Sequence, residues 1–512
     1  MKRIFDFRYV GAFLLTIACA LLPVWSADIP PLLDYHNHLA RQYILARVDG
    51  SATLGQFYKT AWHASPYLAF DAIVQGLASF MPVDVAGKVF LSLTLFLLGL
   101  APLALNLAAF GRITPVALLG LLFVHNETVT LGFVNYLFGI GLALCVAALW
   151  IRLRIGPGWV RLLLFPLLCS LIFFSHLLGF VIYALVIVTY ELGKYLGGLR
   201  RPDNSMSWRF DSDARLNLLS IFIQCAVPLV IFAAFGPSTA SVSSNTYGGL
   251  ERKFSLLVGM FGYLLPTYIW TLDKAMQLAL PAALVLLVAT RRLRVDPALR
   301  WPLGAMLLLF FAMPMELFSG WGADHRLLPA LGLLLVGSLR PANGGSGRLL
   351  PWAFAGVALL AAARTVAVAS EWRKSDERYA EYVRAFELID NGSRMFFAFG
   401  HAGGKSITSI PEYHMPTLVL STKDVYVPYL FASNSGSFTL QYQSDVEPLQ
   451  RLSRGPVLTH GESPDWPAIQ GKFDYFFLVN QQHFRSPPPA ELVSIFEGRT
   501  IRVYRAALGK GR

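Results

Sequence analysis

Long apolar runs recur through the first 370 residues of this chain, and they restrict it to few folds. Each run has about 15–25 residues, the length at which an α-helix crosses the hydrocarbon core of a bilayer. Only 14% of the residues are charged, whereas a soluble domain carries about a quarter, and the mean hydropathy is +0.51. The sequence therefore predicts a polytopic α-helical membrane protein.

The apolar runs predict about eleven membrane spans. They are 9–27, 89–109, 114–125, 132–151, 162–175, 177–193, 216–236, 275–290, 301–318, 327–339 and 349–370. The N-terminal run resembles a signal peptide, and we interpret it as an uncleaved first span. The apolar segment 66–82 carries Asp71 and Gln75, so we expect it to lie on the outer membrane surface as an amphipathic helix.

The distribution of positive charge orients these spans. Lys and Arg concentrate in short alternate loops, such as 152–161 and 291–300. The positive-inside rule then places the N-terminus inside and residues 371–512 outside, so we expect a protein of the cytoplasmic membrane with an extracytoplasmic active face. The net charge of +12 therefore reflects topology. Because no basic strip is interleaved with aromatic residues, the sequence predicts no nucleic-acid partner.

Composition divides the chain into two regions. Residues 1–370 are predicted to form the transmembrane catalytic module, with long outer loops at 28–88 and 237–274. Residues 371–512 are predicted to form a small external α/β domain, with a helix at 371–390 and strands at 394–399, 417–420, 474–479 and 500–504. The polar stretch 237–245 is either a lid beside a site or a plain connector.

Polar residues that suit catalysis follow the first span. Pro30 and Pro31 end the first helix and hold the chain extended. Asp34 is then a suitable N-cap for a helix on which Asp34, His38 and Arg41 share one face. An acid, an imidazole and a guanidinium on one face suit the deprotonation of a hydroxyl beside a phosphate. The alternative is a helix cap followed by a solvated polar face.

The other outer turns supply further ionisable residues, which are Glu127, His176, His325 and Arg326. Such groups are costly at membrane depth unless they have a use. Glu127 is a second candidate acid, and Arg326 offers a planar fork of donors to a lipid phosphate. The alternatives are a solvated loop carboxylate for Glu127, a structural role for His176, and an Arg326 side chain that extends to the lipid headgroups.

No cofactor is firmly predicted. The chain has no nucleotide-binding or serine-hydrolase motif in a fitting context. A divalent metal ion on Asp34, His36 or His38 is an alternative, although this spacing is common by chance. The four cysteines lie inside apolar runs and are interpreted as packing residues.

One motif resembles a known family. The segment from Pro30 to Tyr43, PPLLDYHNHLARQY, is similar to the first-loop motif of the GT-C superfamily of glycosyltransferases, which use polyprenyl-phosphate sugars. The order of one span, an outer loop that opens with an acidic motif, a polytopic bundle and an external α/β domain also resembles that group. The resemblance covers the architecture of nearly the whole chain.

The resemblance implies a function. Asp34 would be the base that activates the acceptor, although Tyr35 replaces the second acid of the family's Asp-Glu pair, so Asp28 or Glu127 are candidates to share the role. His38, Arg41, His176, His325 and Arg326 are the candidate ligands of substrate and phosphate. We therefore predict an inverting glycosyltransferase that moves a hexosyl or pentosyl group from a polyprenyl-phosphate donor to an extracytoplasmic acceptor. Its predicted partners are this lipid-linked sugar and the surrounding membrane lipids. The alternatives are a transporter or flippase of a lipid-linked glycan and a non-catalytic assembly protein.

Overall fold

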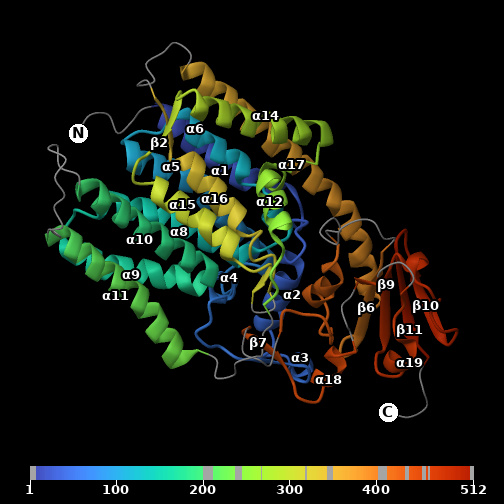
Figure 1. The fold of residues 1–512 in the computed structure, drawn as a ribbon. Coiled ribbons are helices and arrows are strands. Elements are labelled where there is room, and N and C mark those ends of the chain that lie inside the picture. The colour runs from blue at the N-terminus through green and yellow to red at the C-terminus, as the bar shows by residue number, and fades with distance from the viewer. Residues whose placement is uncertain are drawn as a thin grey trace.

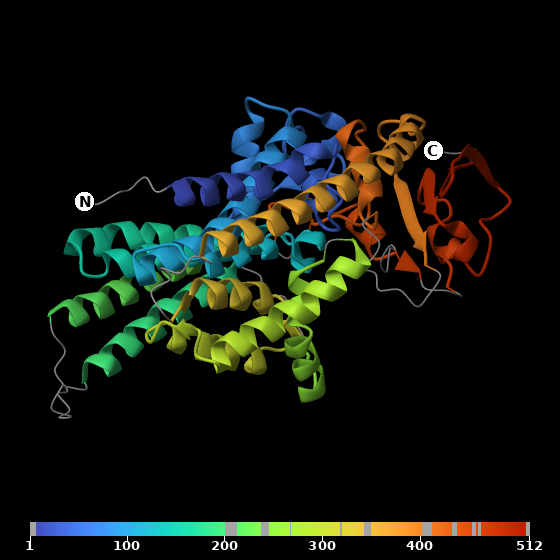
Figure 2. The same cartoon turned by 90° about the horizontal axis from the view of Figure 1, so that it is seen from above.

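A helical bundle and a small sheet domain at one of its ends make up the protein (Figure 1, Figure 2). The computed structural model describes residues 7–199, 212–236, 245–266, 268–317, 320–342, 350–401, 412–432, 438–452, 457–458 and 462–507. The bundle contains α1 (Phe7–Ser26), α4 (Leu68–Ala78), α5 (Val83–Phe110), α8 (Val134–Leu153), α9 (Gly158–Ser175), α10 (Leu177–Leu199), α11 (Ser212–Phe235), α14 (Trp270–Ala289), α15 (Arg300–Ala312), α16 (Leu327–Gly337) and α17 (Leu350–Glu387).

The predicted polytopic helical fold is confirmed. Within the described ranges, seven helices are long and apolar enough to cross a membrane, namely α5, α8, α9, α10, α11, α14 and α17, while α1, α15 and α16 are shorter apolar helices. The predicted span 114–125 is instead broken into α6 (Pro115–Leu118) and the 3-10 helix η1 (Leu119–Phe123). Helix α4 is only about 16 Å long, too short to cross the bilayer core.

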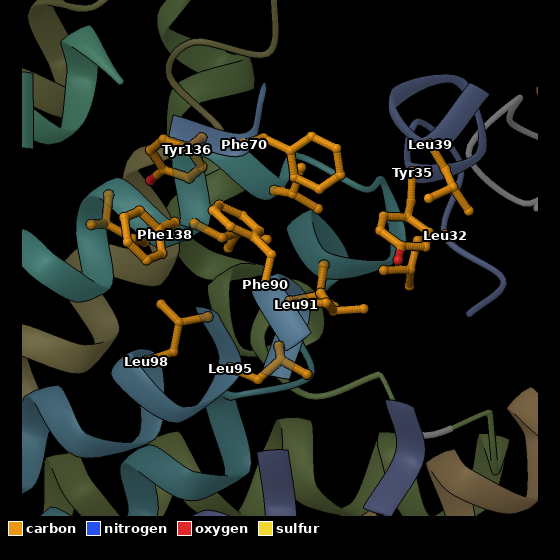
Figure 3. Close-up of a cluster of buried hydrophobic side chains, with 14 of the residues drawn as sticks. Leu32, Tyr35, Leu39, Phe70, Phe90, Leu91, Leu95, Leu98, Tyr136 and Phe138 are labelled. Atoms are coloured by element: carbon orange, nitrogen blue, oxygen red, sulfur yellow. The ribbon is translucent and has the colours of Figure 1, made fainter. Parts of the chain in front are cut away.

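The buried core extends from the bundle to the loop predicted at 28–88 (Figure 3). The rings of Phe70 on α4, Phe90 on α5 and Phe138 on α8 form a chain, with centroid distances of 5.0 Å and 4.9 Å. Tyr35, at the start of α2 (Tyr35–Leu45), packs edge-on against Phe70 at 6.3 Å. The segment that carries Asp34 is therefore anchored on the rigid centre of the bundle.

In the part of the chain that the structure describes, the C-terminal domain has a five-stranded sheet of order β10-β11-β9-β6-β8. The strands are β6 (Met395–Gly400), β8 (Val457–Leu458), β9 (Tyr475–Val479), β10 (Leu492–Glu497) and β11 (Ile501–Ala506). Strand β6 is parallel to β8 and β9, and the other neighbours are antiparallel. The strands predicted at 394–399, 474–479 and 500–504 are confirmed, and β10 was not predicted.

The strand predicted at 417–420 is wrong. These residues belong to the 3-10 helix η3 (Met415–Ser421), in which Pro416 occupies the first turn. A short, fully buried apolar run fits a strand and a buried helical turn equally well, and the proline decides for the helical turn because its fixed φ suits a first turn. Helix η3 packs against α2, and this contact brings the C-terminal domain to the loop 28–88.

Two further connections join the bundle to the C-terminal domain. Helix α17 runs without interruption through the predicted boundary at residue 370 and places Tyr382 and Phe386 against Phe477 of β9. Strand β1 (Tyr58–Thr60), in the loop 28–88, pairs with β7 (Leu440–Tyr442).

The loop predicted at 237–274 is only partly described. The stretch considered as a lid, 237–245, lies outside the described residues up to position 244. The rest of that loop contains α12 (Leu250–Val258) and α13 (Met260–Leu264).

The remaining elements are short. They are α3 (Ala52–Gly55), α7 (Glu127–Thr130), α18 (Glu447–Gln450), α19 (Trp466–Ile469), η4 (Gln481–His483), and the strand pairs β2 (Leu293–Val295) with β5 (Leu339–Pro341) and β3 (Glu316–Leu317) with β4 (Gly320–Trp321). Two of these elements lie against the candidate site. The last turn of α7 contacts the residues before α2, and Trp321 of β4 contacts Arg326.

Candidate active site

Asp34 occupies the N-cap position of α2, as predicted, but its carboxylate makes no capping hydrogen bond. The backbone of this turn is held instead, because Asp34 N donates to Leu131 O at 3.1 Å and Leu33 N donates to Thr130 O at 2.9 Å. Gly132 permits these two backbone segments to lie so close together. Its φ is +75°, and a Cβ there would lie 2.6 Å from Tyr35 N. The backbone is thus fixed while the carboxylate is left for another partner.

That partner is His414, which comes from the C-terminal domain. His414 Nε2 lies 3.4 Å from Asp34 Oδ1, and the Asp34 side chain is 20% exposed. Asn37, one turn further along α2, contacts His414 Nδ1 at 3.1 Å. Sequence reasoning missed His414 because the neighbouring residues were assigned to a strand, and a lone histidine far along the chain carries no signal of this contact.

Arg326 faces the same site from the turn before α16. Its guanidinium lies over the ring of Phe133, the residue after Gly132, at 4.1 Å. Burial lowers the pKa of Arg326, and the charges of Tyr67, Asp34 and Tyr136 oppose that shift. Arg326 Nη2 donates to Trp321 O at 3.0 Å, whereas Nε is buried with no hydrogen-bond partner among the described residues. A cation with a spare donor therefore lies near the Asp34 carboxylate.

Glu127 and His325 form a second pair at this end of the bundle. Glu127 begins α7, whose last turn supports Asp34, and its Oε2 lies 3.8 Å from His325 Nε2. Burial raises the pKa of Glu127 to about 7 and lowers the pKa of His325 to about 4. Glu127 is therefore poised to exchange a proton near neutral pH, while His325 is uncharged there and can offer a hydrogen bond but no positive charge.

Comparison with known proteins identifies the fold. No family model matches the sequence, and no curated protein matches it. Among solved structures, ArnT from Cupriavidus metallidurans bound to undecaprenyl phosphate is similar over 98% of this chain and 98% of its own, with a TM-score of 0.53 and 12% identity. The apo state of the same protein covers 97% of this chain and 98% of its own, with a TM-score of 0.52 and 13% identity.

The chain has the fold of ArnT. The architecture predicted from the first-loop motif is thereby confirmed, although at this identity the likeness establishes the fold alone.

Within this fold, His38 and Arg41 are buried on α2. Arg41 Nη2 and Nε both contact Asp71 Oδ1, at 2.6 Å and 3.1 Å, and both side chains are 1% exposed. The remaining nitrogen, Nη1, donates to Phe431 O at 3.2 Å, and Nη2 also lies 3.2 Å from His38 Nδ1. The contacts give Arg41 a structural role, and its contact with a substrate phosphate stays a prediction.

Two other candidates lie apart from the carboxylate of Asp34. Asp28 is exposed beside α17, where its backbone N–H donates to Asp376 Oδ1 at 2.9 Å. His176 is buried between α9 and α10, and its ring packs edge-on against Tyr67 at 5.0 Å and Tyr136 at 5.2 Å. Both tyrosines also act on Arg326, so His176 supports the walls of the site. Roles for Asp28 and His176 in catalysis or binding stay predictions.

The suggested metal ligands do not converge. Within the described ranges, no group of three or more His, Cys, Asp or Glu side chains is placed to hold a metal ion. His36 is fully buried, and neither of its ring nitrogens has a hydrogen-bond partner among the described residues. His38 Nδ1 faces the guanidinium of Arg41, which is an unfavourable neighbour for a cation. A divalent metal ion stays an untested alternative.

Proposed function

We propose that this chain is a membrane-embedded glycosyltransferase that inverts the anomeric centre as it moves a sugar from a polyprenyl-phosphate donor to an acceptor hydroxyl. The observation that carries the proposal is the Asp34 carboxylate, which is partly exposed, unused by the helix it begins, and close to the guanidinium of Arg326. The fold supports the proposal, since the similar ArnT structure holds undecaprenyl phosphate.

The chemistry needs one base and one cation. Asp34 accepts the proton of the acceptor hydroxyl, whose oxygen then forms a bond to the anomeric carbon of the donor sugar. The bond from that carbon to the phosphate oxygen breaks, and its electron pair stays on the phosphate. Arg326, whose Nε donates to no residue in the described ranges, stabilises the charge of the leaving polyprenyl phosphate. Attack from the side opposite the leaving group inverts the stereocentre.

Glu127 suits an auxiliary proton transfer. Its pKa of about 7 means that both protonation states are populated at neutral pH. His325, which is neutral there, offers a hydrogen bond to the same substrate region. We place the reaction on the extracytoplasmic face of the cytoplasmic membrane, where the positive-inside rule puts residues 371–512.

The test is transfer by purified full-length protein in lipid nanodiscs. Polyprenyl phosphates that carry one hexose or one pentose are supplied, and the release of polyprenyl phosphate is followed by mass spectrometry. Asp34→Asn should lower kcat by about 100- to 10,000-fold, the usual contribution of a general base. Asp49→Asn, at an exposed position beyond α2, is the matched control and should leave kcat unchanged. Wild-type turnover in Asp34→Asn would exclude Asp34 as the base.

A further inference from the structure

The side chain of His414 is held in one orientation by aromatic rings. Tyr429 stacks on it with an interplanar angle of 12° and a centroid distance of 5.4 Å. Tyr413 packs edge-on at 4.4 Å, and Phe431 packs edge-on at 5.4 Å. The side chain is only 3% exposed. The direction in which each ring nitrogen points is therefore set by packing within the C-terminal domain.

Asn37 then selects one tautomer of this ring. Phe431 N–H can only donate, and it lies 2.7 Å from Asn37 Oδ1. The carbonyl of Tyr429 can only accept, and it lies 3.1 Å from Asn37 Nδ2. These two backbone groups fix the amide orientation, so the atom that faces His414 Nδ1 at 3.1 Å is a donor nitrogen.

It follows that Nδ1 of His414 accepts a hydrogen bond and carries no proton. The proton of the neutral ring is on Nε2, the nitrogen that faces Asp34 Oδ1 at 3.4 Å. In this tautomer the ring donates through Nε2 in the direction of the carboxylate.

We propose that His414 is the positioning residue of Asp34, and that the C-terminal domain thereby completes the active site. This inference rests on the proposed function for the role of Asp34. The Nε2–H group holds Oδ1 and leaves Oδ2 to receive the proton of the acceptor hydroxyl. The distance of 3.4 Å is long for a hydrogen bond, as is common in catalytic sites without substrate, and we expect it to shorten when substrate is bound.

The first test reads the tautomer and needs no activity. In full-length protein labelled with ¹⁵N-histidine, the resonances absent from His414→Gln identify this ring among ten histidines. We expect an unprotonated Nδ1 and a protonated Nε2. The Nε2 resonance should move in Asp34→Asn and stay in place in Asp49→Asn. A ring protonated on Nδ1, or one that does not respond to Asp34→Asn, would overturn the inference even if the protein transferred no sugar.

The second test separates positioning from structure. The amide nitrogen of glutamine can replace Nε2, whereas that of asparagine reaches only the position of Nδ1. His414→Asn should therefore lower kcat by about 10- to 100-fold with an unchanged KM for the donor, and His414→Gln should retain kcat within about tenfold. His483→Asn, on η4, is the matched control. If His414→Asn and His414→Gln lost kcat to the same extent and also lowered the melting temperature to the same extent, His414 would have a structural role and the proposal would be refuted.

Discussion

Replacing Arg41 should destabilise the fold around α2 and α4 more than it slows the chemistry. The Arg41–Asp71 pair is 1% exposed on each side and spans 2.6 Å, so solvent does not screen it. Breaking a buried pair by removing one partner costs about 3–5 kcal/mol, because the other charge stays buried. Gln42 and Thr439 still donate to Asp71, which puts our estimate for Arg41→Met at the lower end, about 3 kcal/mol.

The assay is thermal unfolding of the full chain in nanodiscs, followed by tryptophan fluorescence. A loss of about 3 kcal/mol should lower the melting temperature by about 3 °C, because an entropy of unfolding of roughly 2.1 cal/mol/K per residue amounts to about 1.1 kcal/mol/K for 512 residues. Adding Asp71→Asn removes the orphaned charge but keeps hydrogen-bonding groups for Gln42 and Thr439, so the double variant should recover part of the loss.

Arg47→Met provides a matched control. It breaks a pair with Asp424 whose side chains are 35% and 24% exposed, and it should cost under about 1 kcal/mol. A variant at Arg41 that melts like the wild type but has a raised KM for the donor would refute the structural role and favour the contact with phosphate.

Two further predictions follow from the backbone and from burial at the site. Gly132→Ala should lower the free energy of unfolding by about 1–3 kcal/mol and also lower kcat, because the positive φ and the closeness of Tyr35 N leave no room for a Cβ. Wild-type stability and kcat in that variant would contradict this account of how Asp34 is held. The pKa of Glu127 is raised to about 7, so the folded chain binds this proton more tightly than the unfolded chain, and the associated stability is lost as pH rises from about 4.5 to about 7. The free energy of unfolding should fall over that window by at most about 1.4 kcal/mol per pH unit, which lowers the melting temperature, and Glu127→Gln should lack this component. An identical pH dependence in the wild type and Glu127→Gln would refute the burial argument.

The membrane fold could be predicted from the sequence because its cause is local. A bilayer demands continuous helical hydrogen bonding and a fixed apolar length, and both are visible in the runs that became α5, α8 and α10. The place of Asp34 was also predictable, since prolines followed by an N-cap residue mark a helix start. Where the apolar segment was short, as at 114–125, its length allowed either a crossing of a thin membrane or a broken helix, and the structure shows the broken helix.

The partners in the site could not be predicted, because they come from distant parts of the chain. Helical spacing brought His38 and Arg41 together, as their 3.2 Å contact shows, but gave no sign that Asp71 would take the guanidinium. The contact of Asp34 with His414 joins residues 380 positions apart through η3, which periodicity assigned to a strand. Burial, which changes the charge state of His325 and Glu127, is likewise a property of the assembled fold.

Helix α17 continues without a break from the bundle to the sheet domain, so the thickness of the bilayer should affect the geometry of the candidate active site. Beyond residue 370 the helix continues to Glu387, a rigid arm of about 25 Å that carries the sheet domain. A change in tilt of about 10° would displace the tip of this arm by about 4 Å, more than the length of a hydrogen bond. A membrane-spanning helix adjusts to a thicker or thinner bilayer by changing its tilt. The lipid environment should therefore act on the reaction by moving an entire domain, even where no lipid touches the reacting atoms.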